Sequence, residues 1–359
     1  MSAVAATLQR AWLSRGLLAW VLSPVSALMW SLVATRRLAY RLGWLRRHGL
    51  PRTVLVVGNR IVGGAGKTPT TLALLTHLRA TGWCPGVLTR GYGARHAPGD
   101  HALILDAESA PSLTADQTGD EPLLLWRRTG VPLAIDRDRV RGGQALLARH
   151  PEIDILVCDD GLQHLRLARD IEVVVFDERG QGNGWLLPAG PLREPIETQP
   201  LPGLSAAPLV LYNGCPPSTP LPGFRGAATL GELQALANWW RGVRTEDRPS
   251  PADSLARPYL ALAGVAHPQR FFDGLRQQGW HITELPLPDH ADMATLPWPD
   301  QPCDLIVTEK DAVKLAPDRL ARERPLTRVW VAPLDFQPEP AFWQALDDAL
   351  ARARRRPAA

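Results

Sequence analysis

The sequence predicts an α/β protein in which a larger and a smaller α/β domain follow a hydrophobic N-terminal helix. Three observations predict this fold: an uncharged stretch at residues 16–35, an alternation of apolar runs with helical patterns from Thr53 onwards, and a second such series from residue 259. A length of 359 residues suits two domains. The expected limits are 1–50 for a membrane-associated helical segment, 51–245 for the larger domain and 255–350 for the smaller one.

The uncharged stretch at residues 16–35 is long enough to span a bilayer. Pro24 lies near its middle, arginines flank it on both sides, and several tryptophans suit a membrane interface. We favour a helix that lies in the interface; a single span and an ordinary buried helix of the soluble domain are the alternatives. No A-x-A-like site precedes the basic cluster, so a cleaved signal peptide is not expected. In the first two cases, the arginines after the segment place the body of the protein in the cytoplasm.

Charge is distributed unevenly along the chain. No Asp or Glu precedes Asp100, whereas residues 1–99 carry thirteen Lys and Arg and the rest carry 27 basic against 36 acidic side chains. A basic N-terminal portion ahead of an acidic body indicates an anionic membrane surface or an anionic substrate. We expect neither a nucleic acid nor an obligate protein partner. The four cysteines include no C-x-x-C pair, so neither a zinc site nor a disulfide framework is expected.

Short apolar strands and helical stretches alternate in the body of the chain. The strands are rich in Val, Ile and Leu without polar alternation, which is typical of a sheet buried on both faces. We predict strands at 53–58, 86–89, 131–135, 154–158, 171–176 and 208–213, with helices at 68–81 and 137–149. A second series is predicted at 259–280, 303–315 and 328–333; the runs 215–222 and 245–253 are predicted connections or insertions, and the basic tail 352–356 a solvated end.

A glycine-rich turn lies between the first predicted strand and the first predicted helix. It resembles the phosphate-binding pattern G-x-x-x-x-G-K-[ST], but Ile61 stands where that pattern has its first glycine. Glycines let backbone N–H groups approach phosphates, and a helix N-terminus adds partial positive charge. Lys67 would reach the β- and γ-phosphates of ATP, and Thr68 would bind Mg²⁺. The sequence therefore predicts a P-loop NTPase-like α/β/α sandwich whose ATP-binding residues are Ile61, Val62, Gly63, Gly64, Ala65, Gly66, Lys67 and Thr68.

The chain has only three lysines among forty basic residues, so composition alone does not explain Lys67. Other interpretations of the turn are a purely structural glycine turn, a membrane-recruited switch ATPase that acts through a protein partner, and a non-catalytic nucleotide sensor. A switch ATPase of the partitioning type has a signature lysine just before the first glycine. Val62 stands at that position, which argues against this class.

Two carboxylates, Asp159 and Asp160, follow the predicted strand at 154–158. An acid at the end of a strand near a P-loop is the usual second anchor of Mg²⁺. A helix N-cap would explain one of the pair but not easily both. The two residues are therefore candidate metal ligands.

Other chemistry-bearing residues give weaker signals. Asp120 and Glu121 lie in a turn bounded by glycine and proline, and an N-cap would explain them equally well. His290 lies in a loop between aspartates, where a lone histidine is more often a surface residue. Arg193 lies in the glycine- and proline-rich loop 182–195 and is a candidate clamp for a phosphate or a substrate.

Taken together, these stretches resemble the family of tetraacyldisaccharide 4'-kinases, which phosphorylate the lipid A precursor. The family's loop also lacks the first glycine, since it reads G-N-x-x-x-G-G-x-G-K-T-P. The hydrophobic segment at 16–35 matches the family's membrane-associated helix. The matching motifs, in order along the chain, lie at 58–69, 88–93, 118–125, 159–164, 182–195, 263–272, 287–290 and 308–315.

The resemblance implies transfer of the γ-phosphate of ATP to the 4'-hydroxyl of tetraacyldisaccharide 1-phosphate at the cytoplasmic face of the inner membrane. By position, it implies that Asp120 is the general base and that His290 is its partner. It implies two α/β/α domains with the site between them, and closure of the domains as a gate. Around Mg²⁺ it implies Thr68, Glu121, Asp159 and Asp160, and as further active-site contacts His164 and Arg193.

The chain departs from the family pattern in two places. Ala291 stands where the family often has a second histidine, and His267 replaces the asparagine of a G-I-A-N-P-like run. His290 itself is kept, so the implied pair with Asp120 is complete.

Overall fold

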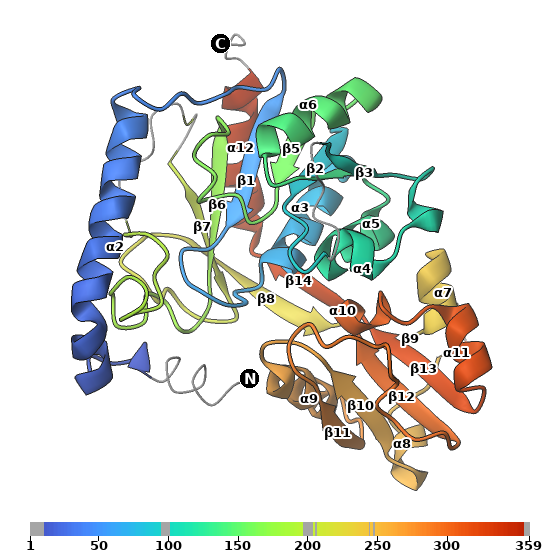
Figure 1. Cartoon of the computed structure of the whole chain (residues 1–359). Coiled ribbons are helices and arrows are strands. Elements are labelled where there is room, and N and C mark those ends of the chain that lie inside the picture. The colour runs from blue at the N-terminus through green and yellow to red at the C-terminus, as the bar shows by residue number, and fades with distance from the viewer. Residues whose placement is uncertain are drawn as a thin grey trace.

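The computed structural model describes residues 11–94, 101–196, 204, 207–243, 245–246 and 248–354. These residues form a nine-stranded sheet and a five-stranded sheet, and one long helix stands at the side of the larger sheet (Figure 1). The predicted α/β fold with a second, smaller α/β unit is therefore confirmed.

The larger sheet has β1 near its middle, with β5 and β6 paired to it in parallel on either side. Parallel pairing brings the carboxyl ends of these strands to one edge of the sheet, where binding loops gather. All six predicted strands of this sheet are confirmed. In spatial order the strands are β14 (Leu334–Pro338), β8 (Phe224–Leu230), β7 (Leu209–Asn213), β6 (Ile171–Phe176), β1 (Thr53–Gly58), β5 (Ile155–Cys158), β2 (Pro85–Thr89), β4 (Leu133–Ile135) and β3 (Leu103–Leu105).

Helices cover both faces of this sheet. The face that carries Leu55 and Val57 packs against α3 (Lys67–Ala80), α5 (Asp120–Thr129) and α12 (Pro340–Arg354). The opposite face, with Val54 and Val56, packs against α6 (Arg139–Arg149). The predicted helices at 68–81 and 137–149 are thus confirmed, and the short helices η1 (Ala110–Ser112) and α4 (Ala115–Thr118) precede α5.

The smaller sheet has four parallel strands and one antiparallel edge strand. It explains the second predicted series, in which each apolar run is a strand; a helix follows the first two runs, whereas strand β14 follows the third. Its strands in spatial order are β11 (Ile282–Pro286), β10 (Tyr259–Ala263), β12 (Cys303–Thr308), β13 (Thr327–Ala332) and β9 (Gln234–Ala235). Its helices are α7 (Leu236–Arg241), α8 (Asp253–Ala256), α9 (Pro268–Gln277), α10 (Glu309–Ala312) and α11 (Pro317–Glu323).

A two-stranded connection joins the sheets. The chain passes from β8 in the larger sheet to β9 in the smaller one, and it returns from β13 to β14, which pairs with β8. The strand pairing therefore departs from the expected limits 51–245 and 255–350 at two places. β9 and α7 associate with the smaller sheet, whereas β14 and α12 return to the larger one because their apolar residues cover its exposed edge and face.

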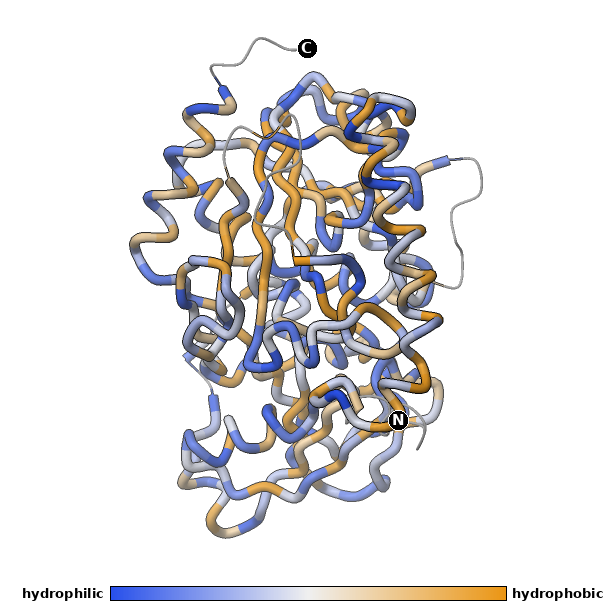
Figure 2. The backbone as a smooth tube through the Cα atoms, turned by 90° about the vertical axis from the view of Figure 1, so that its left-hand side faces the viewer, coloured by the Kyte–Doolittle hydropathy of each residue, from blue (hydrophilic) through white to orange (hydrophobic). Residues whose placement is uncertain are grey.

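The N-terminal helix α2 (Leu17–Arg41) contains the predicted hydrophobic segment. A narrow stripe that includes Ala19, Ser26 and Arg37 is buried against the body, whereas Leu17 and Leu28 are 83% and 62% exposed. Figure 2 shows hydrophobic residues along this helix as it rises from the N-terminal end. It is the one helix among the described residues that is long and apolar enough to cross a membrane. The alternative of an ordinary buried helix is therefore wrong.

The predicted connections also correspond to the structure. Residues 215–222 join β7 to β8 without a regular element, and 245–253 lead from α7 into α8, with residues 244 and 247 outside the described set. Arg352 and Arg354 end α12, and residues 355–359 lie outside the described residues.

Candidate active site

The glycine-rich loop runs from the carboxyl end of β1 to the N-terminus of α3. Gly66 precedes the helix with φ of +88°, and a Cβ there would lie 2.2 Å from the side-chain nitrogen of Asn213. Only glycine meets both conditions at low cost. The backbone N–H groups at the start of α3 have no side-chain cap, so they can bind an anion.

Side chains hold the loop in this shape. Arg179 donates to the carbonyl oxygens of Val62 and Gly64, each at 3.0 Å, and its guanidinium is paired with the buried Asp177. Asn59 donates to the carbonyl of Gly63 at 3.1 Å and accepts from Nζ of Lys67 at 3.3 Å. Because the bonds from Arg179 and Asn59 use backbone carbonyl oxygens, they occupy none of the N–H groups of the loop.

Ile61 explains why the first glycine of the common pattern is missing. Its side chain is fully buried and packs against Leu186 and Leu192. The backbone of Ile61 also forms a β-bridge with Leu192. Val62 donates its N–H to the carbonyl of Pro191 at 2.9 Å. This part of the loop is therefore attached to the segment that carries Arg193, and the contribution of Ile61 and Val62 to nucleotide binding stays a prediction.

Asp159 and Asp160 end β5 beside this loop. Asp159 is buried and accepts from Oγ1 of Thr71 at 2.8 Å. Burial and the nearby charge of Glu121 raise the pKa of Asp159 to about 6. Asp160 lies 3.9 Å from Nζ of Lys67 and has a positive φ of 48°, a costly conformation for a residue other than glycine.

Asp120 and His290 meet although they belong to different sheets. Asp120 begins α5 on the larger sheet, His290 follows β11 of the smaller sheet, and Nδ1 of His290 lies 3.0 Å from Oδ2 of Asp120. His290 has a φ of 57°, and among the described residues it shares a positive φ outside glycine only with Asp160. The pair implied by the resemblance is thus already formed in this structure, so closure of the domains is not needed to make this contact.

The surroundings of the pair favour its charged form. The hydrogen bond to Asp120 raises the pKa of His290, against the effect of burial. Burial raises the pKa of Asp120, but the hydrogen bond with His290 and the charge of Lys314 outweigh it and leave that pKa below its usual range. Asp120 is therefore a carboxylate at neutral pH.

Glu121, the next residue of α5, faces the phosphate loop. Lys310 of the smaller sheet donates to Oε1 of Glu121, and Lys67 and His290 also contribute positive charge at this carboxylate. Burial raises the pKa of Glu121, but the charge and hydrogen bond of Lys310 lower it by more than burial raises it. The pKa of Glu121 therefore lies below its usual range. One turn of helix therefore presents Asp120 to His290 and Glu121 to the charges around Lys67.

The other two predicted contacts differ from each other. Arg193 donates to Oδ1 of Asp160 at 3.2 Å and so lies with the carboxylates beside the phosphate loop. His164 instead faces Arg139 and Arg169, and burial together with these charges lowers its pKa to about 4. These neighbours include none of the predicted catalytic or metal residues, so a direct role for His164 in the site stays a prediction.

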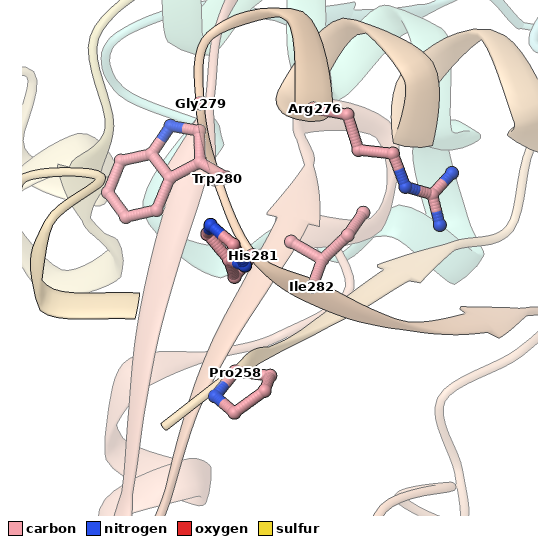
Figure 3. A pocket seen from close by; sticks show the side chains of 6 residues that line it. All are labelled: Pro258, Arg276, Gly279, Trp280, His281 and Ile282. Atoms are coloured by element: carbon pink, nitrogen blue, oxygen red, sulfur yellow. The ribbon is translucent and has the colours of Figure 1, made fainter. Parts of the chain in front are cut away.

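One cavity among the described residues lies away from this site. Its volume is about 390 Å³, and it is lined by Pro258, Arg276, Gly279, Trp280, His281 and Ile282 (Figure 3). It lies where β10 and β11 begin, whereas His290 follows the end of β11. The site is therefore identified from its converging side chains and not from this cavity.

Comparison with known proteins agrees with this arrangement. The sequence model of the family described as tetraacyldisaccharide-1-P 4'-kinase (LpxK) matches residues 18–351. The chain belongs to this family. It is therefore a kinase, an enzyme that transfers a phosphoryl group, and the alternatives of a switch ATPase or a nucleotide sensor have no support.

Individual relatives cover nearly the whole chain. A tetraacyldisaccharide 4'-kinase of Methylibium petroleiphilum is 56% identical and covers 96% of this chain and 94% of its own length. One of Leptothrix cholodnii is 52% identical and covers 98% and 97%. A crystal structure of LpxK from Aquifex aeolicus in complex with ATP has the same fold, with a TM-score of 0.75, 24% identity and coverage of 94% of this chain and 99% of that one.

Sequence reasoning missed several residues that the structure brings to the site. Asn59 and Arg179 hold the phosphate loop, and Lys310 and Lys314 contact the two acids of α5. The scarcity of lysine was a usable signal for the last two, since the three lysines of the chain all lie here. Arg179 carried no such signal, because arginine is common throughout the chain.

Proposed function

We propose that this kinase transfers the γ-phosphate of ATP to the 4'-hydroxyl of tetraacyldisaccharide 1-phosphate, the reaction after which its relatives are named. One observation carries the proposal: the first turn of α5 presents Asp120 to His290 while the adjacent Glu121 shares the charge environment of Lys67 and Asp159. Asp120, which can accept a proton, therefore lies next to the residue that shares the charge of Lys67, which can bind phosphate. Transfer of a phosphoryl group to an alcohol requires both.

In this proposal Asp120 accepts the proton of the sugar hydroxyl. Its Oδ2 faces Nδ1 of His290, which orients the carboxylate and stabilises its charge. Lys67 and the N-terminus of α3 bind the phosphates of ATP, and the resulting alignment supplies most of the rate enhancement. Proton transfer contributes roughly 10²–10⁴-fold.

The residues beside the phosphate loop fit Mg²⁺. Asp159, Asp160 and the hydroxyl of Thr68 are hard oxygen donors. Burial and, after it, the charge of Glu121 raise the pKa of Asp159, and a bound cation would offset both effects. Among the described residues no group of three or more His, Cys, Asp and Glu side chains could hold a metal alone, as is usual for an ion that keeps water and phosphate oxygens as ligands. When bound, Mg²⁺ neutralises charge on the transferring phosphate. Glu121 would join this set if it left Lys310.

We further propose that α2 attaches the enzyme to the cytoplasmic face of the inner membrane. Ser26 donates to the carbonyl of Leu186 at 2.7 Å, and Arg37 pairs with the buried Glu194, so the helix lies along the body of the protein. A helix held in this way, with its apolar side chains on the outer face, suits an orientation in the interface better than a span. The arginines at its C-terminal end would attract anionic lipid.

Replacement of Asp120 tests the reaction. With Mg²⁺-ATP and the disaccharide lipid in detergent, the unchanged protein is expected to form 4'-phosphorylated product. Asp120→Asn should lower kcat roughly 10²–10⁴-fold and leave the ATP dissociation constant within about twofold, because the amide cannot accept the proton. Full turnover by the variant would contradict the role of Asp120, and absence of lipid phosphorylation by the unchanged protein would contradict the function.

Vesicle binding tests the membrane proposal. Leu28→Asn removes an exposed apolar side chain without touching the buried stripe, and it should lower partition into anionic vesicles roughly tenfold. Activity on lipid in detergent should not change. Equal partition of the variant and the unchanged protein would refute attachment through this face.

A further inference from the structure

Lys314 lies at the junction of the two sheets, directly beside the pair formed by Asp120 and His290. Its Nζ is 3.0 Å from Oδ2 of Asp120 and donates to the carbonyl oxygen of Ala291 at 3.0 Å. Ala291 follows His290 in the chain. One ammonium group therefore bonds to the carboxylate on the larger sheet and to the loop that carries its histidine partner on the smaller sheet.

The contacts of Asp120 are one-sided. Both His290 and Lys314 make their closest contact with Oδ2, and no hydrogen bond among the described residues reaches Oδ1. Two donors on one oxygen fix the rotation of the carboxylate and leave the other oxygen to accept a proton. Since His290 alone would form one bond to a carboxylate that can turn, the second donor is what restricts the rotation.

The loop that carries His290 requires support. His290 has a φ of 57°, a conformation that costs energy for a residue with a side chain and persists only where its surroundings hold it. Lys314 supplies a bond to the next residue, and its side chain is only 9% exposed. A buried ammonium has three N–H donors on one atom and can bond to several oxygens around that point. The guanidinium of arginine spreads its donors over a plane and cannot reproduce this geometry. This accounts for a lysine in a chain that otherwise uses arginine.

A purely structural alternative must be distinguished. The buried Asp311 lies 3.8 Å from Nζ of Lys314, and Lys314 could serve only to neutralise that charge. Asp311 accepts at Oδ2 from Oγ1 of Thr308 at 2.7 Å and from the N–H of Gly264 at 2.9 Å, whereas its Oδ1, the oxygen nearest Lys314, is buried without a hydrogen-bond partner among the described residues. At 3.8 Å, Lys314 therefore offsets the charge of Asp311 without a hydrogen bond to it. The shorter contacts of Lys314 go to Asp120 and Ala291.

We propose that Lys314 is a positioning residue of the phosphoryl-transfer site, which joins Asp120 to the His290 loop so that Oδ1 of Asp120 faces the acceptor hydroxyl. The inference rests on the proposed function, because it gives Oδ1 the task of receiving the hydroxyl proton. It assigns no contact with substrate to Lys314. Its effect is on alignment, which governs turnover rather than the binding of ATP.

Three substitutions test the inference. Lys314→Gln keeps a donor for the carbonyl of Ala291 but removes the charge, and Lys314→Arg keeps the charge. Arg319→Met is the matched control, since Arg319 donates to the carbonyls of Met293 and Ala294 on the same loop and its ion pair is with Glu323, not Asp120. Steady-state kinetics with the disaccharide lipid in detergent and Mg²⁺-ATP give kcat and the KM for ATP, and thermal unfolding reports folding.

The expected result is a loss of about 10²-fold in kcat for Lys314→Gln with the KM for ATP within about twofold, since misalignment near the reacting atoms has effects of this size. Lys314→Arg should recover about tenfold of that loss, and Arg319→Met should stay within about threefold of the unchanged enzyme. A Lys314→Gln variant with normal kcat, or with lower thermal stability as its only change, would overturn the inference. So would an equal loss in Arg319→Met.

If Lys314→Gln does not fold, Lys314→Arg decides the question. The planar guanidinium of arginine changes the geometry of the contacts, so normal kcat in this variant would contradict a positioning role. Absence of activity in the unchanged enzyme would instead contradict the proposed function.

Discussion

The two sides of the active site are built in different ways. The ATP side takes most of its groups from one continuous segment, residues 59–71, and from loops at the carboxyl ends of strands that neighbour β1. The acceptor side takes Asp120 from the larger sheet and His290 and Lys314 from the smaller one. The first therefore depends on local backbone geometry, whereas the second depends on how the two sheets are held against each other.

The largest expected effect comes from breaking the local side. Lys67→Met removes the charge that would bind the phosphates and should lower kcat/KM for ATP on the order of 10³-fold, the size of effect seen when a charge-stabilising donor is lost. The contact between Asp120 and His290 should persist, because Lys67 does not take part in it. Nucleotide titration and steady-state kinetics measure the two effects, and a variant that binds ATP normally would show that the loop is not the nucleotide site.

The next effect comes from breaking the contact between the sheets. Arg128 of α5 donates to both carboxylate oxygens of Glu309, at 2.7 and 2.8 Å, and Glu309 is 4% exposed. Arg128→Met leaves this buried carboxylate without its charged partner and should lower the free energy of unfolding by about 3 kcal/mol. Because α5 also carries Asp120, kcat should fall while ATP affinity stays the same.

Chemical denaturation measures the loss of stability. Arg276→Met is a suitable control, since Arg276 makes half-exposed ion pairs with Asp273 and Glu284 beside the smaller sheet and should contribute at most about 1 kcal/mol. If the two variants lose equal stability, or if Arg128→Met alters ATP affinity as strongly as kcat, the proposed difference between the local and the assembled side is wrong.

This difference also explains what the sequence could predict. The strand, loop and helix at 53–80 were predictable because apolar periodicity, glycines and Lys67 lie within one short window. Asp120 and His290 are 170 residues apart, and each was weak evidence by itself; only the resemblance to a family joined them. Physical patterns along a chain do not report which distant loops will meet.

The remaining misses have similar causes. β3 has three residues, and β8 has only one buried residue among its seven, so neither shows the apolar run that predicts a strand. β14 directly follows β13 of the smaller sheet along the chain, but it pairs with β8 of the larger sheet. Tertiary contacts determine this pairing, and the local sequence does not report them. Arg179 holds the phosphate loop from more than a hundred residues away, and arginines of that kind occur along the whole chain.

The smallest expected effect concerns the pH dependence of stability and His164, in the segment that follows Asp159 and Asp160. Burial and the charges of Arg139 and Arg169 lower the pKa of His164 to about 4 from an ordinary 6.5, so the folded state resists protonation. The stabilising contribution is therefore complete above pH 6.5 and is lost as the pH falls towards 4, by about 2 kcal/mol at pH 5. The Nε2 atom of His164 is buried without a hydrogen-bond partner, which agrees with a neutral ring.

Denaturation at pH 7.5 and pH 5 measures this contribution. The unchanged protein should lose about 2 kcal/mol more than His164→Gln between the two conditions. Carboxylates such as Asp136, whose pKa is also lowered, act mainly below this range and cancel in the comparison. Parallel stability losses in both proteins would mean that His164 is not the group responsible.

The strand connection between the sheets has a consequence for how the chain is made. The ribosome completes the whole smaller sheet, through β13, before it adds β14 and α12, which finish the larger sheet. Until residues 334–354 emerge, the edge of β8 lacks its partner strand and Phe342 and Leu346 are not yet present to cover the sheet. The phosphate loop at residues 61–68 thus receives its complete supporting sheet only after residues 334–354 have been added.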